Sequence, residues 1–432
     1  MSKQPFKITP LGGLGETGAL NCMLYHNDDA AILVDCGVMF ADDRRHPGVN
    51  VIVPDFEFLR QFEDKLKAVV LTHGHEDHVG SLPYLLRKFP VPVYATEFTR
   101  GLVANKIAEF NLKDIEVKEL NFDQVVDIHG FEIDPIFVNH SMMDVAALSI
   151  KNSGKHALHL TDFKIDHAAS ENQVIDLARF KALGKEGVDV LLMDSTNALS
   201  HGWTNSESKV RANLIEQFTK IKGRVLACLF SSNTYRIQSL FECARIAGRK
   251  VALTGRSTKE YTRIAMSINR LNMKGIELYD VEEMDQFDDS EVLVVVTGSQ
   301  AEPRSVLYRM SRDMFNPFRV KAGDTLLMSS KMIPGNEGRV LDMLNNLTML
   351  GAHIITPDVD EPIHASGHAK QDELREMMRL IKPKHFIPIH GSYRHLKKHQ
   401  EIAIEEGLAE ERCHLLLNGM CFELSGGEYG II

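Results

Sequence analysis

The sequence predicts an α/β protein in which a doubly wound α/β region is inserted into a domain built on strands. Up to about residue 200, short apolar strands alternate with polar turns, whereas helices and strands alternate from about 200 to 350. The remainder reads as helix, strand, helix and a β-rich end, without a linker or repeat. We therefore expect a first domain from segments 1–200 and 351–432, interrupted by an inserted domain at 201–350.

Runs of β-branched and aliphatic residues define the expected strands of the first segment. These strands lie at 6–9, 31–35, 68–72 and 157–160. In the second segment, helices are expected at 206–221 and 235–247, and strands at 224–230, 250–253 and 292–297. In the third segment, helices are expected at 371–381 and 393–406, with a strand at 385–390. Polar residues or glycine follow the first-segment strands, so the sheet should carry reactive side chains in the loops at its ends.

The composition excludes several classes of protein. Of the 432 residues, 44% are hydrophobic and 25% are charged, which excludes disorder, collagen and coiled coils. No apolar stretch approaches the roughly 18 residues of a membrane span, and the start has no apolar signal-peptide core. We therefore expect a cytoplasmic protein without a membrane partner. The six cysteines form no closely spaced pair, which favours buried reduced thiols over disulfides.

Charge is unevenly distributed along the chain. The net charge of −10 argues against a polyanionic partner, yet residues 201–280 contain fourteen Lys and Arg against six Asp and Glu. This excess has two interpretations. It indicates either a basic surface on one domain that faces an acidic metal centre on another, or a solvated helical surface of mixed charge.

The strongest chemical signal directly follows the strand expected at 68–72. The stretch from His73 to His78, with the sequence HGHEDH, places three imidazoles and acidic side chains within six residues, too many polar groups for a core. Side chains alternate along the loop, and Gly74 lets the backbone bend. His73 and His75 are therefore expected to face one metal, and Asp77 and His78 a neighbouring one. This donor set suits Zn²⁺, with Mn²⁺ as the alternative where carboxylates are more numerous.

Two metals need more ligands than this loop supplies. Three further polar residues, His140, Asp162 and His390, each follow an apolar run at an expected strand end. A lone residue in such a place usually caps a turn, but the loop at 73–78 favours the ligand interpretation. We expect Asp162 to bridge the two cations and His390 to complete the second site. Binding requires neutral imidazoles and ionised carboxylates, so it should weaken in acid.

Several longer strings of residues, from position 11 to about 395, also belong to a recognisable pattern. They are Leu11-Gly12-Gly13-Leu14-Gly15-Glu16, Thr161-Asp162-Phe163-Lys164, Asp194-Ser195-Thr196-Asn197, Gly298-Ser299-Gln300, His364-Ala365-Ser366-Gly367-His368 and Ile387-Pro388-Ile389-His390-Gly391. Together with the metal loop, they resemble the ribonuclease J family, in the β-CASP branch of the metallo-β-lactamase fold. The metal loop alone would specify only the superfamily, which includes lactonases, thioesterases and nucleases.

The resemblance implies a metallo-β-lactamase αββα sandwich with an inserted α/β β-CASP domain. It implies a metal-dependent ribonuclease that degrades single-stranded RNA from the 5′ end, and also cuts internally, with the basic insert clamping the strand. In the family, residues that match His73, His75, His140 and Asp162 bind one metal. Those that match Asp77, His78, Asp162 and His390 bind the other.

The resemblance also implies roles for residues outside the metal loop. His368 would contact the phosphate at the reaction centre, with His364 and Ser366 close by, and Asp194 would support the site. Ser232, Asn233 and Arg256 fall where the family builds its pocket for the 5′ phosphate of the RNA. The chain has Tyr235 where the family typically has His, which bears on this pocket.

The resemblance also bears on assembly. The family has an additional C-terminal domain used in assembly, which this chain is expected to lack. A homo-oligomer is compatible with the sequence.

Two divalent cations predict phosphodiester hydrolysis as the reaction. A water between them loses its proton near neutral pH and attacks phosphorus, while His368 supplies a donor to the phosphate or leaving oxygen. The product carries a 5′ phosphate. Ser366 precedes an amphipathic helix, so it is expected either to help form a phosphate-receptive helix N-terminus or to act only as the N-cap.

Two other functions fit parts of the sequence. A metallohydrolase of a small ester, thioester or lactam would share the metal loop, but such an enzyme needs neither the insert nor His368. A catalytically silent RNA-binding subunit would keep the fold with an incomplete ligand set. Here every ligand position is filled.

Overall fold

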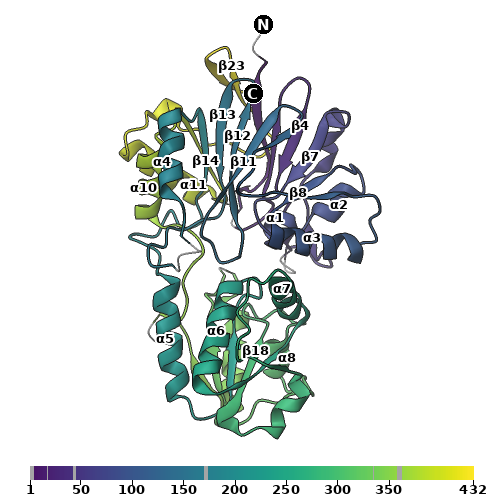
Figure 1. Cartoon of the computed structure of the whole chain (residues 1–432), viewed down its shortest axis with the longest axis vertical. Coiled ribbons are helices and arrows are strands. Elements are labelled where there is room, and N and C mark those ends of the chain that lie inside the picture. Colours follow the sequence, from purple (N-terminus) through teal and green to yellow (C-terminus); the bar gives the residue numbers. More distant parts are fainter. Residues whose placement is uncertain (1–3, 17, 42–44, 170–173, 334, 358–361) are drawn as a thin grey trace. The chain divides into compact units, whose positions relative to one another are not determined.

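The chain forms two compact units. The computed structural model describes residues 4–16, 18–41, 45–169, 174–333, 335–357 and 362–432. The first unit contains the N-terminal part of the chain to Ile165, a segment that ends at Thr204, and the segment Gly367–Ile432. The second unit is mainly Asn205–Ser366, with a short stretch that begins at Asp166. Figure 1 shows the elements of both units.

Two sheets form the centre of the first unit. The larger has eight strands, in the order β24-β23-β1-β3-β4-β7-β8-β9. Their bounds are β1 Phe6–Gly12, β3 Cys22–His26, β4 Ala31–Val34, β7 Leu66–Val70, β8 Val93–Ala95, β9 Val117–Glu119, β23 Phe422–Ser425 and β24 Glu428–Ile431. The smaller has six strands, in the order β10-β11-β12-β13-β14-β21. Their bounds are β10 Val126–Ile128, β11 Phe131–Phe137, β12 Ala146–Asn152, β13 Lys155–Leu160, β14 Val190–Asp194 and β21 His385–Ile389.

Apolar side chains between the two sheets form the main core. Tyr25, Ile32 and Val70 from the larger sheet pack with Leu148 and Leu192 from the smaller one, and all five are buried. The other face of the larger sheet packs on a second cluster that includes residues of the helices α1 Glu76–Val79, α2 Leu82–Leu86 and α3 Glu97–Glu109. Each fully buried aliphatic side chain contributes roughly 1.5–3 kcal/mol, so these faces hold the sheets together.

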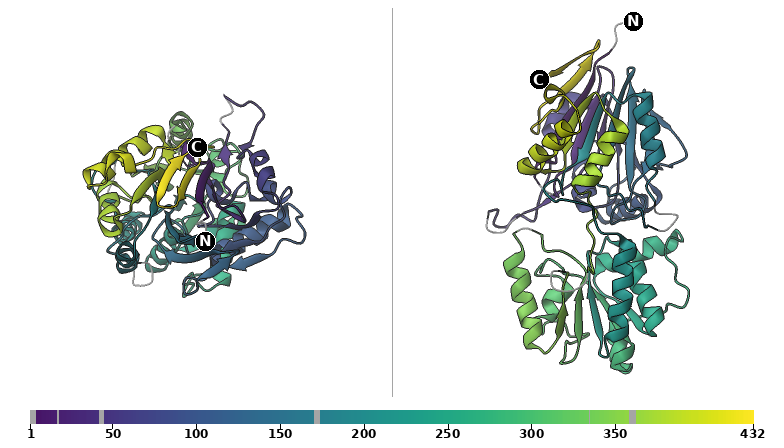
Figure 2. Two further views of the ribbon diagram at one scale, coloured as in Figure 1. Left: turned by 90° about the horizontal axis from the view of Figure 1, so that it is seen from above. Right: turned by 90° about the vertical axis from the view of Figure 1, so that its left-hand side faces the viewer.

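Three helices lie along the smaller sheet. They are α4 Leu177–Glu186, α10 Gln371–Ile381 and α11 Tyr393–Glu405. α4 contacts α10, α10 contacts α11, and α11 packs on β21. These helices lie together on one side of the first unit (Figures 1 and 2). The order helices, sheet, sheet, helices confirms the expected αββα sandwich.

Short elements complete the first unit. The two-residue strands are β2 Leu14–Gly15, β5 Met39–Phe40, β6 Val51–Ile52 and β22 Gly391–Ser392, and the 3-10 helices are Phe56–Phe62 and Glu410–Arg412. β2 pairs with β22, so the glycine-containing N-terminal turn lies beside the residue that follows His390.

The second unit is a parallel six-stranded sheet with helices, in the strand order β17-β16-β18-β15-β19-β20. Its strands are β15 Val225–Cys228, β16 Lys250–Leu253, β17 Leu278–Tyr279, β18 Val292–Val296, β19 Thr325–Met328 and β20 His353–Ile355. Its helices are α5 Glu207–Lys220, α6 Thr234–Ala247, α7 Arg256–Ser267, α8 Val306–Met310 and α9 Glu337–Met349, with 3-10 turns at Val281–Gln286 and Asp289–Glu291. The all-apolar, fully buried β18 is typical of a central parallel strand.

The main part of the second unit, Asn205–Ser366, is an insertion. β14 precedes this part in the chain and β21 follows it, and the two strands pair directly in parallel, with Asp194 opposite Ile389. The chain therefore leaves the smaller sheet after Asp194 and later returns to the neighbouring place in the same sheet.

Most expected elements are present, with bounds shifted by a few residues. The helix expected at 371–381 has those bounds, and that expected at 393–406 ends one residue earlier. All six cysteines are free and five are buried, which confirms the expected reduced thiols. In the part of the chain that the structure describes, no helix is long and apolar enough to cross a membrane.

Three arginines of the basic segment are internal. Arg224 is 3% exposed and pairs with Asp324, Arg236 is fully buried, and Arg249 is 6% exposed and donates to three carbonyl oxygens. For these three residues, the interpretation as a basic surface is wrong. Part of the local charge excess cross-links the second unit from inside.

Arg236 joins three parts of the second unit. Its guanidinium pairs with Glu207 at the start of α5 (2.8 Å), donates to the Ile363 carbonyl oxygen (2.8 Å), and bonds to the Ser329 hydroxyl. We expect Arg236→Met to lower the free energy of unfolding by about 3–5 kcal/mol, because it leaves a carboxylate without its buried partner. Urea unfolding followed by circular dichroism measures the loss. Arg263→Met, at an exposed position of α7, should change stability by less than about 0.5 kcal/mol. Equal effects of the two substitutions would contradict the structural role of Arg236.

Candidate metal centre

Strand ends in the first unit bring the predicted metal-binding side chains together. β7 leads to His73 and His75, and His75 is the N-cap residue of the short helix α1, which contains Asp77 and His78. His140 follows β11, Asp162 follows β13, and His390 follows β21. These residues form two groups of four, each with its ligand atoms within 4.8 Å of one another: His73, His75, His140 and Asp162, and Asp77, His78, Asp162 and His390.

The first group consists of three imidazoles and one carboxylate. Nδ1 of His75 lies 3.0 Å from Nε2 of His73 and 3.2 Å from Nε2 of His140. Both of these Nε2 atoms lie 3.6 Å from Oδ2 of Asp162. His140 donates from Nδ1 to the carbonyl oxygen of Gly367 (2.7 Å), so its Nε2 carries the lone pair. Three nitrogens and one oxygen thus converge on one point, the usual donor set of a zinc site.

The second group combines two imidazoles and two carboxylates. Nε2 of His390 lies 3.2 Å from Oδ2 of Asp77, and Nε2 of His78 lies 3.8 Å from the same oxygen. Nε2 of His78 also lies 3.5 Å from Oδ2 of Asp162. Oδ2 of Asp162 therefore faces both groups.

The other oxygen of Asp162 faces His390. Nδ1 of His390 lies 2.8 Å from Oδ1 of Asp162, at ion-pair distance. Burying carboxylates is costly unless opposite charges compensate them. The convergent carboxylate oxygens and imidazole lone pairs of the two groups fit two divalent cations, and both groups have the composition for one.

The imidazoles of the first group are neutral. Burial, with neighbouring histidines, holds the pKa of His73 well below its ordinary value. Burial also lowers the pKa of His75 to about 4 and that of His140 to about 3, although Asp77 and Asp162 respectively oppose these shifts. These three side chains therefore need to release no proton before they can bind a metal at neutral pH.

The imidazoles of the second group are cationic. Burial acts to lower the pKa of His78, but Asp162, Asp35 and Asp77 outweigh it and raise that pKa to about 10. The pKa of His390 is also raised well above its ordinary value, because Asp162 outweighs burial. The cationic imidazoles of His78 and His390 in turn hold the pKa values of Asp77 and Asp162 below their ordinary range despite burial. Protons on these imidazoles thus balance the buried carboxylates.

Asp35 is a further residue of the candidate site, one that the sequence motifs did not indicate. It follows β4 and accepts a hydrogen bond from Nδ1 of His78 (2.7 Å), which directs Nε2 of His78 toward Asp162. Asp35 also accepts from the backbone and hydroxyl of Thr72, at 2.8 Å each. Such carboxylate–imidazole pairs orient metal-binding histidines. Its place at a strand end, like that of Asp162, is a signal that could have revealed it.

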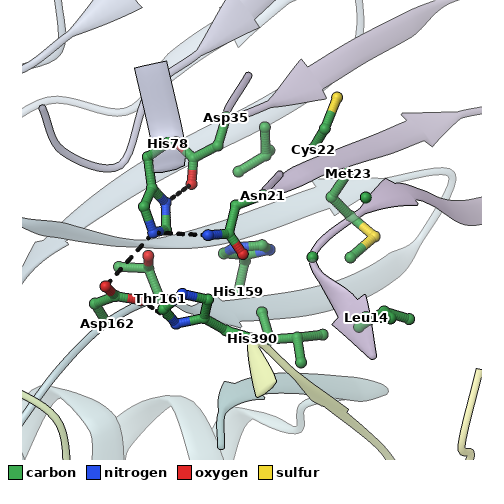
Figure 3. A pocket seen from close by; sticks show the side chains of 14 residues that line it. Leu14, Asn21, Cys22, Met23, Asp35, His78, His159, Thr161, Asp162 and His390 are labelled. Atoms are coloured by element: carbon green, nitrogen blue, oxygen red, sulfur yellow. Dashed lines mark hydrogen bonds and ion pairs between the residues drawn. The ribbon is translucent and has the colours of Figure 1, made fainter. Parts of the chain in front are cut away.

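Asn21 is a second residue that the sequence analysis missed. Its amide lies 3.1 Å from Nε2 of His78 and donates to the carbonyl oxygen of Asp77 (3.1 Å). Figure 3 shows Asn21, His78 and Asp35 linked beside a cavity of about 10 Å³, which Asp162 and His390 also line. This volume is close to that needed for one water molecule.

Glycines allow the backbone to pass close to this site. Gly13 has φ of +88°, and a Cβ there would lie 2.7 Å from Oδ1 of Asn21. A Cβ on Gly37 would lie only 1.6 Å from the carbonyl oxygen of Asp77. Any larger residue at position 37 would therefore displace the helix that carries Asp77 and His78.

His368 and Asp194 form a pair next to the two groups. Nδ1 of His368 lies 2.8 Å from Oδ2 of Asp194, and Nδ1 of His390 lies 3.2 Å from Oδ1 of the same carboxylate. Burial acts to lower the pKa of His368, but Asp194 and Asp162 raise it above the ordinary value. The His368 side chain is 22% exposed and that of Asp194 is 1% exposed. Of the pair, the imidazole is therefore the group that a substrate can reach.

The remaining predicted residues belong to the second unit. Asn233 caps α6 by accepting from the backbone N–H of Arg236 (2.9 Å), Ser232 precedes it, and Arg256 is the first residue of α7. The hydroxyls of Ser231 and Ser257 (2.9 Å) join the starts of the two helices. The structure thus brings Ser232, Asn233 and Arg256 into one part of the second unit.

His364 and Ser366 lie at the end of the second unit. Burial, with Arg236, lowers the pKa of His364 to about 3, and its Nδ1 donates to the carbonyl oxygen of Ser329 (3.2 Å). The N-cap interpretation of Ser366 is wrong, because α10 begins at Gln371 and Lys370 is its N-cap residue. The residues between Ser366 and Gln371 are not helical. Among them, the carbonyl oxygen of Gly367 contacts His140, and His368 contacts Asp194.

Comparison with known proteins gives matches to three families. Residues 15–142 match the metallo-beta-lactamase superfamily, 222–347 the beta-CASP domain of ribonuclease J, and 359–415 the Zn-dependent metallo-hydrolase RNA specificity domain. The chain is 38% identical to ribonuclease J of Helicobacter pylori over 424 residues, which cover 97% of this chain and 60% of that protein. It is 36% identical to ribonuclease J of Thermus thermophilus, covering 97% and 74% of the two chains.

The chain belongs to the ribonuclease J family. The resemblance seen in the sequence is thereby confirmed, and the metallo-β-lactamase fold implies divalent metal ions. The chain spans 60% of the length of the Helicobacter relative. A crystal structure of a protein of unknown function from Enterococcus faecalis V583 shares the fold, with a TM-score of 0.65 and 16% identity over 97% of this chain and 100% of that one.

The two groups should differ in the pH dependence of metal binding. The first group is neutral at pH 7 and should release few protons on binding, whereas His78, with its pKa raised to about 10, must lose one. Lowering the pH from 9 to 6 should therefore weaken binding at the second group by about tenfold or more per unit, and binding at the first group much less. Calorimetric titration with Zn²⁺ in buffers of different ionisation enthalpy measures the protons released. Equal release in both binding steps would contradict this assignment.

Proposed function

We propose that this chain is a metal-dependent ribonuclease that hydrolyses phosphodiester bonds of single-stranded RNA. The observation that carries the proposal is the pair of four-residue groups that share Asp162, with His368 beside them on Asp194. The match of residues 359–415 to an RNA specificity domain supports RNA as the substrate. A silent RNA-binding subunit would be expected to lack part of this donor set, whereas here all seven side chains converge.

Two divalent cations would occupy the two groups, with Zn²⁺ preferred and Mn²⁺ as the alternative. His73, His75, His140 and Asp162 would hold the first, and Asp77, His78, Asp162 and His390 the second. When bound, such a pair supplies hydroxide at neutral pH and stabilises the charge that develops on phosphoryl oxygens. The zinc preference rests on the imidazole-rich first group, since Mn²⁺ favours oxygen donors.

His368 would act as the proton donor of the reaction. Asp194 holds Nδ1 of His368, so the proton on Nε2 is directed away from the carboxylate. The raised pKa of His368 keeps the imidazole protonated at neutral pH. It can therefore give a proton to the leaving 3′ oxygen of the RNA, so that the product retains a 5′ phosphate. Asp194 remains ionised, because His368 and His390 lower its pKa despite burial.

The starts of α6 and α7 would hold the 5′ phosphate of the RNA. Ser232 and Asn233 lie at the start of α6, and the Arg256 guanidinium adds a charge at the start of α7. Helix N-termini favour anions, and arginine binds phosphate through a planar set of donors. This arrangement supports degradation from the 5′ end, with internal cleavage as a second mode.

Cleavage of a labelled RNA tests the proposed function. The purified chain, loaded with Zn²⁺ or Mn²⁺, should release labelled mononucleotide from a 5′-labelled single-stranded RNA with a 5′ monophosphate, and more slowly from one with a triphosphate. Asp162→Ala should lower the rate at least a thousandfold, by the order of magnitude typical of a lost catalytic group. Asp123→Ala, at an exposed position, should cleave normally. RNA left intact by the wild-type protein with either metal would refute the proposal.

Trp203 provides an optical test of RNA binding. It is the single tryptophan of the chain, and its side chain is 43% exposed. The hydroxyl of the next residue, Thr204, donates to the carbonyl oxygen of His368 (2.9 Å). Because aromatic side chains stack on bases, single-stranded RNA should quench its fluorescence in the Asp162→Ala protein, which leaves the RNA intact.

Substitution of Trp203 extends this test. Trp203→Ala should raise KM by about tenfold, corresponding to the loss of one stacked base, with little effect on kcat. Trp203→Phe, which keeps a stacking ring, is the matched control. RNA that shifts the protein on a gel without changing its fluorescence would show that Trp203 lies outside the contact.

A further inference from the structure

The turn that carries Asp194 has a second attachment, away from the metal centre. The hydroxyl of Ser195 is hydrogen-bonded to Nδ1 of His399 in α11 (2.9 Å). Both side chains are completely buried. A polar pair therefore lies inside the first unit, one residue from the carboxylate that holds His368.

The hydrogen bond to Ser195 is the one polar contact described for the His399 ring. The ring packs against Phe386 of β21, with centroids 4.8 Å apart, and its Nε2 is buried without a hydrogen-bond partner. Burial lowers its pKa to about 3, so it is neutral. An apolar side chain would fill this place without leaving a buried polar atom unpaired. The bond to Ser195 is thus the polar function that this histidine serves.

Ser195 lies between Asp194 and Thr196, one of the two residues that fix the Asp194 carboxylate. Oδ1 of Asp194 accepts hydrogen bonds from the backbone N–H (2.9 Å) and the hydroxyl (2.7 Å) of Thr196. Oδ2 of Asp194 accepts a hydrogen bond from Nδ1 of His368 (2.8 Å). Because successive side chains of an extended chain point to opposite sides, Ser195 can hold α11 while Asp194 faces the site. A shift of Ser195 would move Asp194 and Thr196 together.

The same helix also contacts the turn that carries His390. α11 begins at Tyr393, three residues after His390. A Cβ on Gly391 would lie 2.9 Å from Cβ of His395 and 3.4 Å from Cβ of Ser195, so the two turns and the helix pack tightly. The hydroxyl oxygen of Thr196 also lies 3.2 Å from the carbonyl oxygen of His390. α11 is therefore a common support for the turns of Asp194 and His390.

We propose that Ser195 and His399 are a positioning pair, which sets the orientation of Asp194 and through it that of His368. Neither residue touches substrate. The proposal rests on the proposed function, because RNA hydrolysis is the main readout of how His368 is oriented.

A second buried Ser–His pair offers a matched control. The hydroxyl of Ser149 on β12 is hydrogen-bonded to Nε2 of His156 on β13 (2.8 Å), and both residues are buried. His156 lies near the start of β13, whereas Asp162 follows the end of that strand. This pair has the same chemistry as Ser195 and His399, but it lies within the smaller sheet, at the end of β13 away from the metal centre.

The test compares Ser195→Ala with Ser149→Ala in the metal-loaded protein. Both substitutions should lower the melting temperature by a similar amount, since each removes one buried hydrogen bond. Ser195→Ala should also lower kcat by about 10–100-fold, the usual effect of losing an orienting partner, with KM and metal content unchanged. Ser149→Ala should leave kcat within about twofold. Equal kcat values for the two variants, or a loss of bound metal that accounts for the effect of Ser195→Ala, would overturn the proposal.

Substitutions of His399 separate its hydrogen bond from its packing. The amide of Asn takes roughly the place of Nδ1, so His399→Asn should retain most of the activity, whereas His399→Leu should behave like Ser195→Ala. Equal activity of the two His399 variants would also overturn the proposal.

A crystal structure of the Ser195→Ala protein gives a readout that does not depend on activity. His368 should be rotated out of hydrogen-bond distance from Asp194. An unchanged His368–Asp194 pair would refute the positioning role even if the wild-type protein cleaved no RNA, so this failure is distinct from that of the proposed function.

Discussion

The buried carboxylate of Asp162 is the constraint on which the first unit depends. Its Oδ2 lies 3.5–3.6 Å from nitrogens of His73 and His78, in the segment after β7, and of His140, after β11. Burying a charge in a protein interior is costly unless opposite charges or donors surround it. The segments after β7, β11 and β13 meet at this carboxylate, and the cationic imidazoles of His78 and His390 compensate its charge.

Much of this centre could be predicted from residue types at strand ends. His140, Asp162 and His390 each follow an apolar run that reads as a strand, and β11, β13 and β21 run in the same direction, so these residues lie at one edge of the smaller sheet. Asp35 and Asn21 were harder to predict, since they act through hydrogen bonds to His78 and Asp77 and have no motif of their own. Asp35 also has a positive φ of 61°, a conformation set by the packed fold and not by local sequence.

Tertiary contacts override the local sequence pattern at two places. Ser366 precedes a helix and reads as its cap, but the helix starts five residues later, after a bend at Gly367 and His368 that contacts His140 and Asp194. Arg224, Arg236 and Arg249 were counted as surface charge, although aspartate, glutamate and carbonyl partners far along the chain make their burial tolerable. Neither outcome can be read from composition or spacing, because both depend on residues that only the fold brings near.

The insertion of the second unit between β14 and β21 determines the order in which the metal centre is made on the ribosome. The four residues of the first group are complete once Asp162 has emerged, before the inserted unit is translated. The second group is complete only when His390 has been synthesised, more than two hundred residues after Asp162, and His368 is synthesised shortly before His390. During synthesis the chain thus passes through a stage in which all four residues of the first group are present, but His368 and His390 are not.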